Sequence, residues 1–141
     1  MSVSMWREVR WLDHTGSTNY DVAEEARRGG AEGLAVATLE QRAGRGRMDR
    51  TWVAPPGTSL AFSMLLEPRP ELSQWGWLSL LAGMAVHAAV DGLATEPGRV
   101  QLKWPNDVLI DGRKVCGILS ERVEHQDGAR AVIGIGINVS I

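Results

Sequence analysis

Apolar and polar positions follow two different spacings along this chain, and the difference separates strand segments from helices. Residues 8–13 alternate polar and apolar side chains, a period of two that predicts a half-buried strand. Residues 34–40 form a mostly apolar run, which predicts a buried strand, and residues 59–66 predict another. Four later runs also have strand character: 100–103, 108–110, 115–124 and 130–139.

Two segments have helical character. The first covers 20–28, where Ser17 or Thr18 can cap its start and a pair of glycines ends it. The second, 73–93, is the longest, and its helical spacing predicts one apolar face. That face comprises Leu78, Leu81, Ala82, Ala85, Ala89 and Leu93.

The end of the chain is rich in hairpin signals. Asp-Gly pairs at 111–112 and 127–128 predict tight turns that join the last three strand segments into one antiparallel meander. With only two main helices, this pattern predicts an α+β fold with a mixed or antiparallel sheet flanked by helices, in one domain covering 1–141. The segment 134–139 resembles an interior strand, which needs neighbours. Either a second chain pairs there, giving a homodimer through a late edge strand, or a carboxy-terminal piece has been removed.

Composition narrows the class of protein. The net charge of −2 argues against general nucleic-acid binding, so DNA is not an expected partner. The single cysteine, Cys116, excludes an internal disulfide and suits a reducing cytosol, and its strand position predicts a small buried side chain. Residues 1–11 carry charges where a signal peptide needs an apolar run, and no segment has the apolar length of a membrane span. The sequence therefore predicts a cytoplasmic protein.

Several common catalytic patterns are missing. The sequence has no Gly-x-x-x-x-Gly-Lys-Ser/Thr loop, and the pair Gly134 and Gly136 lacks the third glycine and the helix of a dinucleotide site. The three histidines have no metal-ligand spacing, and no serine lies in a nucleophile elbow. Covalent catalysis by the protein is therefore not expected.

The segment 41–52 is the strongest functional signal. It carries four arginines and one aspartate, with small residues and glycines between them. Glycine lets the backbone approach a ligand closely, and guanidinium groups bind phosphate or carboxylate in a bidentate manner. A solvated basic turn would not need the glycines, so the segment predicts a clamp for an anion.

Three further sets of donors lie between the predicted elements. Residues 103–107 combine a lysine in a buried strand with a proline-fixed turn, amide and carboxylate, although an ordinary turn remains the alternative. In 113–117, Lys114 opens a strand and Gly117 leaves room beside it, a weak signal alone. Residues 17–19 present hydroxyl and N–H groups that either bind a polar head group or simply cap the helix. Together the sets predict direct attack by one substrate on another at phosphorus, with catalysis from positioning and charge stabilisation.

These sets, in this order, resemble the catalytic domain of biotin protein ligases (biotin–[acetyl-CoA-carboxylase] ligases). The matching segments are 17–19, 41–52, 103–107, 114–117 and 134–138. The resemblance implies a fold related to the class II aminoacyl-tRNA synthetase core. It also implies that biotin attacks MgATP to give biotinyl-5′-AMP and pyrophosphate, and that a lysine of a biotin carboxyl carrier protein then attacks the adenylate.

The resemblance further implies roles for individual residues. Biotin would be bound by Ser17, Thr18, Asn19, Gln41, Gly44, Arg45, Gly46, Arg47, Lys114, Gly117 and Gly134. ATP would be bound by Arg47, Arg50, Trp52, Lys103, Asn106, Lys114 and Asn138. The catalytic residues would be Arg45, Arg47 and Lys114, with Asp107 orienting the acceptor lysine or taking its proton. No direct metal ligand is assigned, because Mg²⁺ would arrive with ATP.

The chain departs from the family pattern at three places. Met48 and Asp49 stand where the family usually has a residue followed by glycine, although aspartate tolerates left-handed backbone. No winged-helix segment precedes Met1, so a repressor is not expected, and the family continues beyond the last strand segment. Two alternatives remain, a non-enzymatic biotin-binding or dimerisation module and a lipoate–protein ligase. The second is disfavoured by the segments 45–47 and 103–107.

Overall fold

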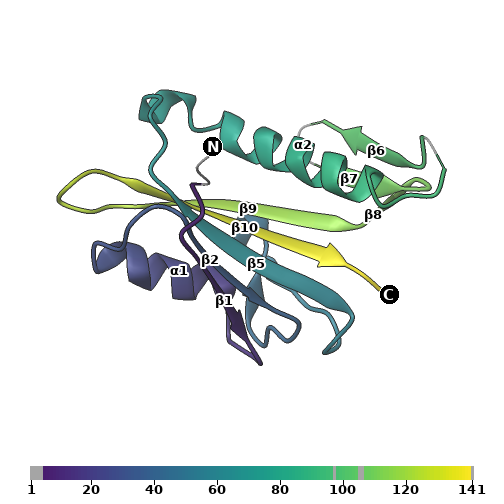
Figure 1. Ribbon diagram of the computed structural model, residues 1–141, viewed down its shortest axis with the longest axis horizontal. Coiled ribbons are helices and arrows are strands. Elements are labelled where there is room, and N and C mark those ends of the chain that lie inside the picture. The colour runs from purple at the N-terminus through teal and green to yellow at the C-terminus, as the bar shows by residue number, and fades with distance from the viewer. Residues whose placement is uncertain (1–4, 97, 105–106, 141) are drawn as a thin grey trace.

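The computed structural model describes residues 5–96, 98–104 and 107–140, and its centre is a twisted sheet of five strands (Figure 1). The order across the sheet is β1 (Glu8–Leu12), β2 (Leu34–Thr38), β5 (Ser59–Leu66), β10 (Arg130–Asn138) and β9 (Cys116–Val123). β1 and β2 are parallel and the other pairs are antiparallel. The sheet is therefore mixed, as the sequence predicts.

Each face of this sheet is covered, as Figure 1 shows. The helix α1 (Thr18–Arg27) lies on one face, where Val22 and Leu65 are fully buried. The helix α2 (Trp77–Asp91) lies on the other, together with the small sheet of β6 (Val100–Lys103), β7 (Asp107–Ile110) and β8 (Arg113–Lys114). Because successive strand residues point to opposite faces, Val132 and Ile133 of β10 join different clusters and both are buried. The α+β class is confirmed.

The start of α1 is set by a local hydrogen bond. The Ser17 side chain accepts the backbone N–H of Tyr20 at 3.3 Å, so Ser17 is the N-cap that the sequence offered as one of two candidates. After the helix, Gly29 takes φ +83°, a conformation that favours glycine. The first turn of α1 lies beside β5, where Thr18 and Asn19 contact Ser63.

The apolar face predicted for α2 is wrong in part, because Leu78 and Ala82 pack in the core while the other four predicted residues are exposed. Leu81 is 57% exposed and Leu93 85% exposed, whereas Val86 is 5% exposed and packs in the core. The residues of α2 that the core covers are Leu78, Ala82, Gly83, Val86 and Val90. The helix is apolar nearly all round, so spacing alone gave too little contrast to identify the packed face. The helix also begins at Trp77, after a short 3₁₀ turn at Leu72–Gln74.

The predicted single meander at the end of the chain is also wrong in part. The Asp111-Gly112 turn joins β7 to β8 in the small sheet, and the chain then passes at Val115 into β9 of the large sheet. The turn around Gly128 joins β9 to β10 as expected. β10 lies between β5 and β9, so both its neighbours belong to this chain. The expectation that the last strand offers a free edge to another chain is therefore incorrect.

None of the helices in the described part of the chain combines the length and the apolar character that crossing a membrane requires.

Candidate functional site

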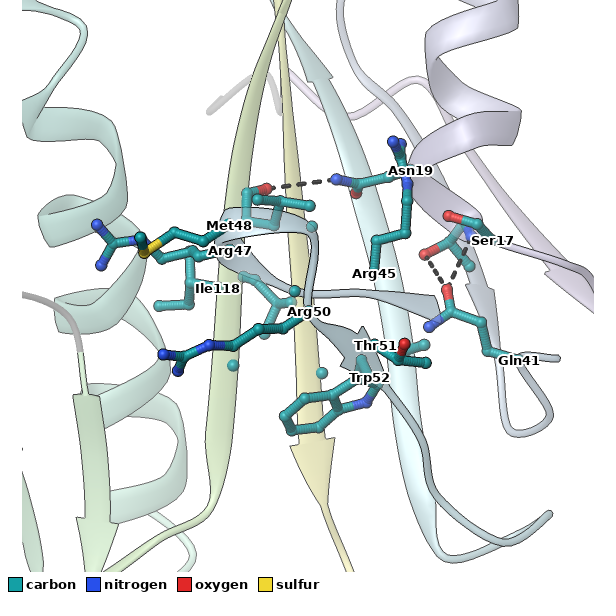
Figure 2. A pocket seen from close by; sticks show the side chains of 18 of the residues that line it. Ser17, Asn19, Gln41, Arg45, Arg47, Met48, Arg50, Thr51, Trp52 and Ile118 are labelled. Atoms are coloured by element: carbon teal, nitrogen blue, oxygen red, sulfur yellow. Dashed lines mark hydrogen bonds between the residues drawn. The ribbon is translucent and has the colours of Figure 1, made fainter. Parts of the chain in front are cut away.

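A cavity of about 400 Å³ lies between the start of α1, the arginine segment and the surface of β9 and β10 (Figure 2). Thirteen of the residues predicted to bind substrate or act in catalysis line it: Ser17, Thr18, Asn19, Gln41, Arg45, Gly46, Arg47, Arg50, Trp52, Asp107, Lys114, Gly117 and Gly134. They come from five separate stretches of the chain. Their gathering around one cavity is what an extended small-molecule site requires.

One end of the cavity is polar and hydrogen bonded. The Thr18 backbone N–H donates to Gln41 Oε1 at 2.9 Å, and the Thr18 hydroxyl lies 3.2 Å from the same oxygen. Gly44 does not line the cavity, but a side chain there would overlap Gln41 and the Trp52 carbonyl. Gly44 therefore makes room for the Gln41 amide.

Asn19 occupies space that a glycine leaves open. Its Nδ2 donates to Glu121 Oε1 at 2.9 Å and to the Leu119 carbonyl at 3.4 Å, and Figure 2 draws the second of these bonds. A Cβ at Gly134 would overlap the Asn19 amide. The close approach of helix and strand thus depends on the absence of a side chain at 134.

The Trp52 ring lies on a similar pair of glycines. Gly117 and Gly136 are directly opposite each other on β9 and β10, and a Cβ at either would come within 2.7 Å of the indole. Trp52 ends β4 (Thr51–Trp52), which pairs with β3 (Gly44–Arg45) across the arginine segment. Because these two glycines have no side chains, the Trp52 ring and the arginine segment that carries it can lie close to β9 and β10.

The tip of the arginine segment has an unusual backbone. Met48 and Asp49 both take left-handed φ angles, +58° and +59°, within the 3₁₀ turn Arg47–Asp49. Aspartate tolerates this conformation better than most residues, as the sequence suggested. A residue followed by glycine would adopt the same turn with less strain.

The cations of the cavity differ in their pairing. Arg45 Nη2 lies 3.0 Å from Glu121 Oε1, and Lys114 Nζ lies 3.4 Å from Asp107 Oδ1. Arg47 and Arg50 make no ion pair with any residue that the structure describes, and Figure 2 shows both pointing toward α2. These two guanidinium groups are therefore the ones free to meet an added anion.

Besides Gly44, three predicted site residues lie elsewhere or cannot be located. Lys103 is exposed at the end of β6 and does not line the cavity, so its expected position in a buried strand is wrong. Asn138 ends β10, where its backbone N–H donates to the Val115 carbonyl, and it too lies outside the cavity. Asn106 falls outside the described residues.

The sequence analysis missed two residues that do not line the cavity themselves but contact residues that do. Glu121 holds both Asn19 and Arg45, and the fully buried Ser63 contacts Thr18 and Asn19. A serine inside an apolar strand and a glutamate inside another are weak signals. Their partners lie 44 and 102 residues away from them along the chain, which no local pattern encodes.

A second hollow of about 720 Å³ continues from the first toward α2. It shares Arg47, Met48, Ile118 and Leu119 with the first and is flanked by Trp75, Trp77 and Trp104. Trp104 is 70% exposed there. The arginine segment thus stands between a polar cavity and an aromatic one.

Metal ligands and nucleophiles are scarce in this region. Within residues 5–96, 98–104 and 107–140, no three His, Cys, Asp or Glu side chains converge as a metal site. Burial raises the pKa of the Cys116 thiol to about 12, so it stays protonated and unreactive. A cysteine nucleophile is therefore not supported by this geometry.

The sequence matches that of known proteins over nearly its whole length. The pattern of the biotin/lipoate A/B protein ligase family matches residues 12–138. The biotin–[acetyl-CoA-carboxylase] ligase of Mycobacterium tuberculosis is 39% identical over 140 residues, which are 97% of this chain and 51% of that protein. The chain spans about half the length of the curated relatives it matches.

Solved structures agree with the sequence match. Biotin protein ligase from Aquifex aeolicus in complex with biotin and ATP superposes with a TM-score of 0.78 at 34% identity, covering 96% of this chain and 54% of that one. Biotin protein ligase from Leishmania major in complex with biotinyl-5-AMP gives 0.75 at 30% identity, with coverages of 94% and 57%. The likeness extends to the fold class that the sequence predicts.

Proposed function

This chain belongs to the biotin/lipoate A/B protein ligase family, and on that premise we propose that it activates biotin and transfers it to protein. The first step joins biotin to ATP as biotinyl-5′-AMP with release of pyrophosphate. The second passes the biotinyl group to a lysine of a biotin carboxyl carrier protein. The observation that carries the proposal is the single cavity in which the amide and hydroxyl groups of 17–19 and Gln41 meet Arg47, Arg50 and Lys114.

The polar end of the cavity suits the head group of biotin. Its ureido ring carries both N–H donors and a carbonyl acceptor, and Thr18, Asn19 and Gln41 supply partners of both kinds. The Trp52 ring gives an apolar surface for the thiophane ring and the carbon chain. Bound in this way, the carboxylate extends toward the cations.

Charge stabilisation accounts for the first step. The carboxylate attacks the α-phosphate, and negative charge accumulates on the phosphoryl oxygens. Lys114 and Arg47 are the residues that would neutralise it, with Arg50 beside the leaving pyrophosphate. Each charge-assisted hydrogen bond contributes on the order of 1.5–3 kcal/mol. Two of them correspond to a rate effect of roughly 10² to 10⁴ at about 1.4 kcal/mol per tenfold.

The second step requires an amine without its proton. Asp107 lines the cavity and is the carboxylate paired with Lys114, so it can orient the acceptor lysine or take its proton. Mg²⁺ that arrives with ATP fits a site beside Asp107, because Mg²⁺ prefers oxygen ligands and is held mainly by phosphates, waters and one or two carboxylates. Asp107 would be the protein's ligand, and Mg²⁺ would supply further neutralisation of the phosphates.

We place the protein in the cytoplasm, where ATP and carrier proteins are found and where a single buried cysteine remains reduced. Its partners are biotin and the carrier protein. Its net charge of −2 gives no support to DNA as a further partner.

Biotin-dependent exchange of labelled pyrophosphate into ATP tests the activation step. We expect exchange with biotin and MgATP and a strong reduction without biotin. Biotin binding without exchange would favour the non-enzymatic module instead. Faster exchange with lipoate than with biotin would favour a lipoate–protein ligase.

A further inference from the structure

A chain of polar contacts runs behind the cavity and ends at Glu121. Glu121 Oε1 accepts from Asn19 Nδ2 at 2.9 Å. On its other side the Asn19 amide oxygen contacts the Ser63 hydroxyl, which lies 2.7 Å from Thr18 Oγ1. Thr18 in turn contacts Gln41. Glu121 and Ser63 do not line the cavity, whereas Thr18, Asn19 and Gln41 do.

Which group donates and which accepts in each of these contacts follows from the number of protons that each side chain carries. An ionised carboxylate can only accept, so Glu121 fixes the Asn19 amide with its NH₂ group toward 121 and its oxygen toward Ser63. Ser63 has one proton, and the Asn19 oxygen requires it. Two hydroxyl protons then serve three oxygen–oxygen contacts, so the Thr18 hydroxyl donates across its 2.7 Å contact with Ser63, and its longer 3.2 Å contact with Gln41 Oε1 carries no proton.

This direction determines what the cavity offers to a ligand. With its proton given to Ser63, the Thr18 hydroxyl can only accept from a bound molecule. Gln41 Oε1 already accepts the Thr18 backbone N–H, so Gln41 contributes its NH₂ group as a donor. The polar end therefore presents one acceptor beside one donor, which matches a ligand that has an N–H group beside a carbonyl.

We propose that Glu121 is a positioning residue that sets the hydrogen-bond direction of the head-group site through Asn19, Ser63 and Thr18. The identity of the ligand as biotin rests on the proposed function. Glutamine at this position would weaken the restriction, because its amide can donate to Asn19 as well as accept, and only the longer 3.4 Å contact with the Leu119 carbonyl would still favour the parent orientation. The Asn19 amide could then reverse, Ser63 could donate to Thr18, and the acceptor in the cavity would become a donor.

Glu121 also holds Arg45, so the test must separate the two contacts. Arg45 Nη2 lies 3.0 and 3.2 Å from the two carboxylate oxygens. Ser63→Ala removes the other partner of Asn19 without touching this ion pair. If the hydrogen-bond chain is what matters, both Glu121→Gln and Ser63→Ala weaken the binding of a ureido ligand.

The test is a calorimetric titration with biotin of the parent protein, Glu121→Gln, Ser63→Ala and a control. Glu124→Gln is the matched control, because Glu124 is exposed just beyond the same strand and pairs with Arg122. We expect a loss of about 10- to 100-fold in biotin affinity for both test variants, as befits loss of a buried or charge-assisted hydrogen bond. The control should bind as the parent does, and each variant should unfold in one cooperative transition above the temperature of the titration.

A second measurement is independent of biotin. The Asn19 side-chain NH₂ signals, identified by their disappearance in Asn19→Asp, should exchange slowly with solvent in the parent and faster in Glu121→Gln. Unchanged Asn19 signals would overturn the proposal. So would a loss of biotin affinity in Glu121→Gln alone, because the effect would then run through Arg45. If the parent bound no biotin, the proposed function would fail, while the Asn19 signals would still decide the role of Glu121.

Discussion

At the scale of single residues, the cavity depends on side chains that are absent as much as on those present. Gly134 admits Asn19, and Gly117 with Gly136 admits the Trp52 ring. The sequence identified Gly117 as leaving room, but it could not say for which residue. A glycine signals open space, and only the fold decides what fills it.

Gly134→Ala should therefore damage the head-group site. The added methyl overlaps the Asn19 amide inside a fully packed strand, so Asn19 must move. We expect a loss of about 1–3 kcal/mol in the free energy of unfolding and biotin binding weaker by at least roughly tenfold. Urea denaturation and calorimetry measure the two effects. Gly92→Ala is the control, because a methyl there meets only ordinary van der Waals contacts.

Arg47→Gly should weaken retention of the adenylate more than the first binding of biotin. Arg47 is exposed, lines both hollows and points toward α2, away from the polar end. It can therefore hold the phosphate of the adenylate while contributing little to head-group binding. The rate of adenylate release, compared with the biotin affinity, measures the difference.

Arg42→Gly is the matched control for Arg47, because Arg42 lies in the same segment, pairs with Glu40 and does not line the cavity. It should leave both quantities unchanged. An equal loss of biotin and adenylate affinity in Arg47→Gly would mean that Arg47 only shapes the pocket.

The buried thiol makes stability depend on alkaline pH. Because burial raises the pKa of Cys116 to about 12, the unfolded chain loses this proton near pH 8.5 while the folded chain keeps it. The thiol's contribution to stability is thus complete below about pH 8.5 and falls as the pH rises above it. The difference in free energy of unfolding between the parent and Cys116→Ala should shrink by about 1 kcal/mol per pH unit between roughly pH 9 and 11. A constant difference over this range would show that the thiol titrates normally.

At the scale of elements, local signals predicted the fold better than periodicity did. Ser17 capping α1 and the Asp111-Gly112 turn depend on neighbours within a few residues, so the sequence contains what is needed. Two other features depend on tertiary packing. One is which face of α2 is buried, and the other is the passage of the chain at Val115 from β8 of the small sheet into β9 of the large sheet. Those choices are made by tertiary contacts, which the spacing of apolar residues does not encode.

The two candidate faces of α2 can be separated by truncating one residue on each. Val86→Ala should cost about 1–3 kcal/mol, because Val86 is 5% exposed and packs on the core. Leu81→Ala should change stability by about 0.5 kcal/mol or less, because that side chain is 57% exposed. Urea denaturation of both variants checks this. A larger loss of stability in Leu81→Ala than in Val86→Ala would mean that the face predicted from the apolar spacing is the one that packs on the core.

At the scale of the whole molecule, the order of the motifs predicted the family and most of the cavity lining. Residues near 17, 45, 114 and 134 converge because α1, the arginine segment, β8 and β10 meet at one place. The links made by Glu121 and Ser63 were not predictable, because each joins elements that are distant in sequence. The central claim is that this convergence creates one site for a small carboxylic acid and a nucleotide.

A calorimetric titration with biotin, repeated in the presence of a non-hydrolysable ATP analogue with Mg²⁺, tests that claim most directly. The account predicts one biotin per chain, bound more tightly when the nucleotide occupies the site beside the free guanidinium groups of Arg47 and Arg50. Absence of biotin binding under both conditions would contradict it.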